Sequence, residues 1–155
     1  LLYTLAQKGY AVVGVDYSRQ MARHAARYSG QPVARGDGRT LPFRDEQFAT
    51  LVTTFPAPYV LELHTQREFA RVVRPGGLWL WVDNPTLNFT GPFTLLARLL
   101  LTWGTWEPHP DRSVTASPLH EDHSEGLWKV NVTRVRVGPS SVAVRIARRR
   151  DNPKI

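Results

Sequence analysis

The chain of 155 residues contains no cysteine and lacks any long apolar run. Without cysteine there is no disulfide framework, and nothing else in the sequence indicates export. No apolar run approaches the roughly 18 to 20 residues that a membrane span requires, because Arg98 interrupts the most apolar segment, "FTLLARLLLTWGTW". A secretion signal, with a basic segment, an apolar stretch and a small-residue cleavage site, is also missing. We therefore expect a cytoplasmic protein with no membrane span.

Acidic residues are fewer than basic ones, 13 against 20, which leaves a formal net charge of +7. Such an excess is compatible with a polyanionic partner. Most arginines are spread over segments such as "RQMARHAAR" and "REFARVVR", as on a solvated surface, and only "RIARRR" near the end is dense. A non-catalytic nucleic-acid-binding domain that uses this basic end is therefore kept as an alternative function.

The apolar pattern of the first 83 residues predicts alternating helices and strands. The expected helices cover residues 1–9, 19–28 and 63–73, and the expected strands cover 10–16, 31–37, 48–55 and 78–83. We expect Gly9 to end the first helix, Ser18 to cap the second, and Met21, Ala25 and Tyr28 to face inward on it. The alternation favours an α/β fold with a parallel sheet and crossover helices.

The individual segments predict different surroundings. The run "YAVVGVD" is continuously apolar and β-branched, which is typical of a strand buried on both faces. Near the end, "WKVNVTRVRV" and "VAVRIARRR" alternate on either side of a short turn and predict an antiparallel hairpin. Residues 84–126 between these parts predict an insert or lid with an apolar helix around Phe93 and Trp103. The whole chain, 1–155, is expected to be one domain.

Two acids stand where predicted strands end. Asp16 follows "AVVGV" and Asp37 follows "PVARG". Ligands of open parallel sheets bind at the carboxyl ends of the strands, and a carboxylate after the second strand suits the vicinal hydroxyls of a ribose. Two alternatives stay open: Asp16 caps a helix, a role that Ser18 can also fill, or the ribose belongs to NAD in a dehydrogenase. Against the dehydrogenase, no Tyr-x-x-x-Lys pair occurs.

Four segments in order, "GVDYSRQM", "GDGRTLPF", "FATLVTTFPAPY" and "FARVVRPGGLWLWVD", resemble class I S-adenosylmethionine-dependent methyltransferases. The resemblance covers roughly Leu1 to Asp83. It implies a Rossmann-like doubly wound sheet, S-adenosylmethionine as cofactor, and methyl transfer to a small-molecule acceptor. Ala49 departs from the family, which often has an acid at this position.

The same resemblance implies roles for individual residues. Asp16 is expected to bind the adenosyl ribose, with Tyr17 and Met21 on either side of the adenine. Asp37 and the backbone of Gly38 are expected to address the amino edge of the adenine. A flat aromatic surface and a thioether suit a purine face, and a carboxylate accepts from an exocyclic amine.

Thr54 and Phe55, at the end of a further strand, are expected to face the methionine part of the cofactor and the acceptor. Methyl transfer is an in-line displacement that gains most from alignment of the two reactants, so no catalytic residue is assigned. His64 and Glu62 are candidate bases and Tyr59 is a candidate pocket wall. The cluster "LHEDHSE" lies in a polar insert without a second ligand pair, so no metal site is predicted.

The family's first strand and its glycine-rich turn, which holds the methionine end of the cofactor, are not found in these residues. We therefore expect the chain to begin inside a domain. The missing strand would lie between the strands that end near Asp16 and Phe55, so both are expected to lack a partner. The 155 residues alone are expected to bind the cofactor weakly and to have little or no activity.

Overall fold

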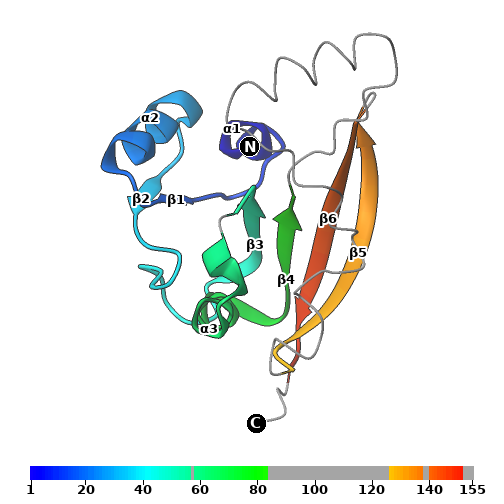
Figure 1. Cartoon of the computed structure of the whole chain (residues 1–155). Coiled ribbons are helices and arrows are strands. Elements are labelled where there is room, and N and C mark those ends of the chain that lie inside the picture. The colour runs from blue at the N-terminus through cyan, green and yellow to red at the C-terminus, as the bar shows by residue number, and fades with distance from the viewer. Residues whose placement is uncertain (57, 84–125, 138–139, 152–155) are drawn as a thin grey trace, which may run out of the picture.

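A computed structural model describes residues 1–56, 58–83, 126–137 and 140–151 (Figure 1). The elements follow in the order α1 (Leu2–Gln7), β1 (Gly14–Asp16), α2 (Arg19–Ser29), β2 (Val33–Arg35), β3 (Phe48–Thr54), the 3-10 helix η1 (Pro58–Leu61), α3 (Leu63–Val72), β4 (Val73–Val82), β5 (Trp128–Val137) and β6 (Ser140–Arg149). The predicted order of elements is confirmed. The predicted lid lies almost entirely outside the described residues.

The strands form two sheets. β1 and β2 pair in parallel, and a second sheet has the order β3-β4-β6-β5, in which β3 and β4 are parallel while β4, β6 and β5 are antiparallel. The hairpin of β5 and β6 forms the edge of the larger sheet, as Figure 1 shows. This mixed α/β fold confirms the prediction. Among the described residues β1 pairs only with β2 and β3 only with β4, as expected for two strands without a common partner.

The prediction for the first strand was wrong in its length and burial. β1 covers only Gly14–Asp16 instead of residues 10–16, and none of its three residues is fully buried. β2 is likewise shorter than predicted and covers Val33–Arg35. The physical reason is that a strand paired along one edge has fewer neighbours to bury its valines than a strand inside a sheet.

Helix α2 begins and ends as predicted but buries a different face. The Ser18 hydroxyl accepts a hydrogen bond of 3.3 Å from the backbone N–H of Met21, so Ser18 is the N-cap. Met21 and Tyr28 are 55% and 75% exposed, whereas Ala22 and Ser29 are buried. The expectation that Met21 and Tyr28 face inward was wrong. The small side chains on the buried face let the helix pack close to β1 and β2, and the large side chains are exposed to solvent.

The core lies between α3 and the larger sheet. Phe69, Val72 and Val73, the predicted core face of α3, are buried, and they surround the fully buried Trp79. The strand after α3 starts earlier than predicted, at Val73 rather than residue 78. The "RPGG" segment does not separate helix from strand but forms an irregularity within β4, with Gly76 at a φ of +69°. Glycine tolerates this left-handed backbone.

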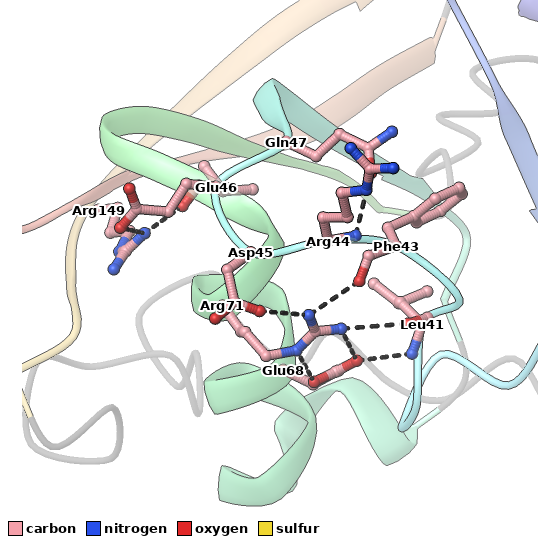
Figure 2. Close-up of polar contacts among 10 residues, drawn as sticks. Leu41, Phe43, Arg44, Asp45, Glu46, Gln47, Glu68, Arg71 and Arg149 are labelled. Atoms are coloured by element: carbon pink, nitrogen blue, oxygen red, sulfur yellow. Dashed lines mark hydrogen bonds and ion pairs between the residues drawn. The ribbon is translucent and has the colours of Figure 1, made fainter.

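Loop 41–47 is tied to α3 through one arginine (Figure 2). The guanidinium of Arg71 donates to the backbone oxygens of Leu41 and Phe43, at 3.1 and 2.8 Å, and to the carboxylate of Asp45, at 2.7 Å. The backbone N–H of Leu41 in turn donates to Glu68 at 2.6 Å. This loop connects the turn after β2 to the start of β3, so the network sets how the two sheets are linked.

In the described part of the chain, no helix combines the length and the apolar character needed to cross a bilayer.

Candidate cofactor site

Asp16 ends β1 and holds its own turn. The backbone N–H of Ser18 donates a hydrogen bond of 2.8 Å to Asp16 Oδ1. Asp16 Oδ2 has no hydrogen-bond partner among the described residues. One oxygen of the carboxylate therefore supports the start of α2, as the capping alternative expects. The other oxygen is not engaged by the described residues, and the ribose role stays a prediction. Oδ1 also retains a second lone pair.

Asp37 lies next to Asp16 because β1 and β2 are parallel and in register. Asp16 pairs with Arg35, and the backbone N–H of Gly36 donates to the Asp16 carbonyl oxygen at 3.1 Å. Asp37 follows immediately, and its Oδ1 accepts a hydrogen bond of 2.9 Å from the backbone N–H of Arg39. Each acid thus uses Oδ1 for its own turn. The two carboxylates stand at the ends of adjacent strands, as predicted.

The ring of Tyr59 lies against the turn that contains Asp37. A Cβ placed on Gly38 would be 2.8 Å from Tyr59 Cε2 and 2.9 Å from its hydroxyl oxygen, so a larger residue would displace the ring. Burial raises the pKa of the Tyr59 phenol, and the negative charges of Asp37 and, more weakly, Asp16 raise it further. The phenol is therefore neutral near pH 7, and both carboxylates lie within electrostatic reach of it.

Tyr17 and Met21 flank the start of α2 and are exposed. Tyr17 is 72% and Met21 is 55% exposed. Ordinary core packing, the alternative role for both side chains, is therefore wrong for this structure. The aromatic ring and the thioether offer apolar surface of the kind that suits a purine base. The two carboxylates offer acceptor oxygens for hydroxyl and amino groups.

Thr54 and Phe55 stand at the end of β3. Phe55 has a φ of +49°, a left-handed conformation that is unfavourable for a bulky residue, and its side chain is 56% exposed. Its backbone N–H donates to the Val82 carbonyl oxygen of β4 at 2.9 Å. The strand pairing thus holds the backbone of Phe55 at the same edge of the sheet at which β4 ends. Strain of this kind recurs at functional sites.

A third acid at this edge was missed by the sequence analysis. Asp83 directly follows β4 and forms an ion pair with the buried side chain of Arg145. The guanidinium carbon of Arg145 also lies over the Trp81 ring, 4.8 Å from the ring centre. The signal was present, because Asp83 ends an apolar strand as Asp16 does. Its pairing with β6 could not be read from the local pattern.

The candidate bases have different surroundings. Glu62 accepts two hydrogen bonds of 3.0 Å from the guanidinium of Arg39, and these bonds hold its pKa below the usual range. The pairing with Arg39 favours the charged form of Glu62, and its role as a base stays a prediction. His64 is exposed at the start of α3. Tyr59 is half-buried, consistent with a pocket wall.

Within the described ranges, no group of three or more histidine, cysteine, aspartate or glutamate side chains is placed to hold a metal ion. The cluster "LHEDHSE" lies outside the described residues.

Parallel strands joined by crossover helices, with acids at their carboxyl ends, are typical of Rossmann-like folds that bind nucleosides. The model of a methyltransferase domain family matches residues 1–81, slightly more than half of the chain. The chain belongs to this family. The membership confirms the family resemblance and favours methyl transfer over the dehydrogenase alternative.

Known proteins agree with this membership. A demethylmenaquinone methyltransferase from Corynebacterium kroppenstedtii is 39% identical over 74 residues, which cover 47% of this chain and 32% of the relative. The PH0226 protein from Pyrococcus horikoshii superposes with a TM-score of 0.61 at 22% identity, covering 96% of this chain and 76% of that protein. A SAM-dependent methyltransferase from Methanosarcina mazei superposes with a TM-score of 0.56 at 18% identity, covering 95% and 85%.

These matches have different extents. The chain spans about a third of the length of the curated relatives that it matches, 32% for the first of them. The structural likenesses, at 22% and 18% identity, establish the fold. S-adenosylmethionine as cofactor agrees with the family and with the fold.

Proposed function

We propose that this chain supplies the adenosine-binding part of a methyltransferase that uses S-adenosylmethionine and a small-molecule acceptor. The observation that carries the proposal is the position of Asp16 and Asp37 at the ends of two paired parallel strands, each with Oδ1 engaged in its own turn. Two acceptor oxygens, one from each acid, are left for one ligand.

Different residues would contact different parts of the cofactor. Asp16 accepts hydrogen bonds from the ribose hydroxyls, and Asp37 accepts from the amino group of the adenine. Tyr17 and Met21 offer apolar surface to the base. Thr54 and Phe55 face the sulfonium end, where the acceptor would enter. These assignments are the ones that the family resemblance implies for the ends of β1, β2 and β3.

The cofactor, when bound, supplies an activated methyl group on a sulfonium. The acceptor atom forms a bond to this carbon as the carbon–sulfur bond breaks, and the electron pair of the broken bond stays on sulfur. The chain's residues contribute by orienting the two reactants in line, which is the larger part of such a rate increase. A proton released by the acceptor goes to solvent or to a base that we do not assign.

The nature of the acceptor is proposed from the relatives. The Corynebacterium kroppenstedtii relative is a demethylmenaquinone methyltransferase, which supports an acceptor that is itself a small, largely apolar aromatic molecule. The exposed ring of Phe55 at the end of β3 offers a surface for such a molecule. A cytoplasmic location, expected from the sequence, stays a prediction.

The proposal is tested by titrating S-adenosylmethionine into a natural-length protein that contains this chain, using calorimetry. Asp16→Asn keeps an oxygen for the Ser18 N–H but removes the charge, so the variant should fold normally. We expect its affinity to fall about tenfold or more, because hydrogen bonds to charged groups are among the stronger ones. Asp151→Asn, an exposed acid beyond β6, is the matched control and should bind as the parent does.

Equal affinity of the parent and Asp16→Asn would refute the ribose role of Asp16. Absence of any binding by the parent, in a protein that circular dichroism shows to be folded, would refute the cofactor itself. Binding of NAD in place of S-adenosylmethionine would favour the dehydrogenase alternative.

A further inference from the structure

Two segments far apart in the sequence meet beside the candidate site. Arg39 lies in the turn after β2, and Glu62 is the N-cap residue of α3. The Nε and Nη2 groups of Arg39 donate to the two oxygens of Glu62, each at 3.0 Å. Although Glu62 occupies the N-cap position, its side chain makes no capping hydrogen bond to the helix. Its carboxylate is directed to the turn after β2 instead.

The same turn is held from a second side by Tyr59. The guanidinium of Arg39 lies over the Tyr59 ring, 5.0 Å from its centre. On the other side the ring packs against Gly38, where a Cβ would come within 2.8 Å. The backbone N–H of Glu62 donates to the Tyr59 carbonyl oxygen at 3.0 Å, which fixes the two residues relative to each other. We name Arg39, Tyr59 and Glu62 the brace.

The brace is connected directly to a proposed ligand of the cofactor. The backbone N–H of Arg39 donates to Asp37 Oδ1 at 2.9 Å, and its guanidinium lies 3.8 Å from the same oxygen. Asp37 Oδ1 is thus in contact with both the backbone and the side chain of Arg39. A fork of two parallel hydrogen bonds defines the position of a guanidinium much more narrowly than a single ion pair.

The Arg39–Glu62 ion pair contributes little to the stability of the fold. The side chains of Arg39 and Glu62 are 43% and 49% exposed. Exposed ion pairs have a small effect on the free energy of unfolding. A pair that is too exposed to stabilise the fold, yet has bidentate geometry and touches a ligand-binding acid, is better explained by the position that it imposes on that acid.

We propose that the Arg39–Glu62 pair, seated on the Tyr59 ring, positions Asp37 and the backbone of Gly38 for the adenine of the cofactor. The inference rests on the proposed function, because it concerns the adenine end of the same site. Arg39 and Glu62 are positioning residues: they act through Asp37 and need not touch the cofactor. The brace also connects the adenine-binding turn to the start of α3, on the acceptor side.

The test measures the affinity for S-adenosylmethionine of Arg39→Gln, Glu62→Gln and the charge-exchanged pair Arg39→Glu with Glu62→Arg, in the natural-length protein. We expect each single change to weaken binding about tenfold. The exchanged pair should recover only part of that loss, because the ion pair is formed again but a carboxylate then lies beside Asp37 and no cation lies over the Tyr59 ring. The thermal midpoint of all three should stay close to that of the parent.

Adenosine provides a readout that a general loss of structure would not reproduce. Because the brace acts at the adenine, its removal should lower the affinities for adenosine and for S-adenosylmethionine by the same factor. In an Asp37→Asn background, Arg39→Gln should have little further effect, since the group through which it acts has already been changed.

The outcomes separate this inference from the proposed function. If the parent binds S-adenosylmethionine and Arg39→Gln binds it equally well, the positioning role of the brace is wrong and the proposed function stands. If Arg39→Gln and Asp37→Asn weaken binding additively, Arg39 does not act through Asp37 and the inference is also wrong. If the folded parent does not bind the cofactor, both fall.

Discussion

The guanidinium of Arg71 donates two hydrogen bonds of 2.7 Å to the carboxylate of Glu68, three residues earlier on α3 (Figure 2). The remaining donors of Arg71 reach backbone oxygens of loop 41–47. One side chain thus connects a helix to the loop that leads from the candidate site into β3. The arrangement satisfies polar groups that would otherwise be buried without partners.

Replacement of Arg71 by glutamine should destabilise the fold by about 2 to 3 kcal/mol, because several charge-assisted hydrogen bonds are lost together. Urea unfolding followed by circular dichroism measures the change. Arg74→Gln is the matched control: Arg74 is exposed, and its replacement should change the free energy of unfolding by less than about 0.5 kcal/mol. Equal effects of the two substitutions would contradict the role given to Arg71.

The Glu68 carboxylate should make stability depend on pH. Hydrogen bonds from Arg71 lower the pKa of Glu68 below its ordinary value, against the opposing effect of burial. A lowered folded-state pKa stabilises the fold above the unfolded pKa of about 4.3, and this contribution is lost as the pH falls through the folded-state pKa.

Glu68→Gln should therefore cost stability at pH 7 and much less at pH 3. Urea unfolding of the parent and the variant at both pH values gives the comparison. In an Arg71→Gln background the cost of Glu68→Gln should no longer change with pH in this way. A cost that is the same at both pH values in the parent would rule out the ion pair as its source.

Gly38→Ala should disturb the site through Tyr59. The added methyl group would meet the Tyr59 ring at 2.8 Å, and overpacking of this kind costs about 1 to 3 kcal/mol. Because the ring cannot keep its place, we expect weaker binding of S-adenosylmethionine as well as lower stability. In a Tyr59→Ala background, Gly38→Ala should cost much less stability and affinity than in the parent, because the ring that the methyl group would meet is absent. Equal costs in the two backgrounds would mean that the ring does not lie against Gly38.

Thr53→Val should leave a buried donor without its acceptor. The indole N–H of the fully buried Trp79 donates to Thr53 Oγ1 at 3.0 Å, across the parallel strands β3 and β4. Valine has nearly the same shape but no acceptor, so we expect a loss of about 1 to 3 kcal/mol. Thr50→Val, at an exposed position of the same strand, should have little effect. Unfolding followed by tryptophan fluorescence compares the two.

The fold could be predicted largely because its signals are local. The valines before Asp16, the serine at the start of α2 and the glycine after it, and the alternation in β5 and β6 each act within a few residues. The face of α2 was the exception. Periodicity indicates that a helix has two faces, but contact with β1 and β2 selects the small side chains of Ala22 and Ser29 over Met21 and Tyr28.

The site was predictable in part for the same reason. Asp16 and Asp37 can be recognised because each directly follows a predicted strand, and parallel pairing then brings them together. The partners of these acids could not be found in this way. Arg39 and Glu62 are separated by 23 residues, and neither residue type is unusual at its position.

The sequence by itself determined the order of helices and strands, the family, and the two acids at the strand ends, because backbone preferences and apolar periodicity act over short distances along the chain. Only the tertiary structure decided that the Tyr59 ring lies against Gly38, that Glu62 pairs with Arg39, and that Arg71 holds loop 41–47. Such contacts depend on how separate elements pack, and side-chain geometry selects among many partners only once the chain has brought them together.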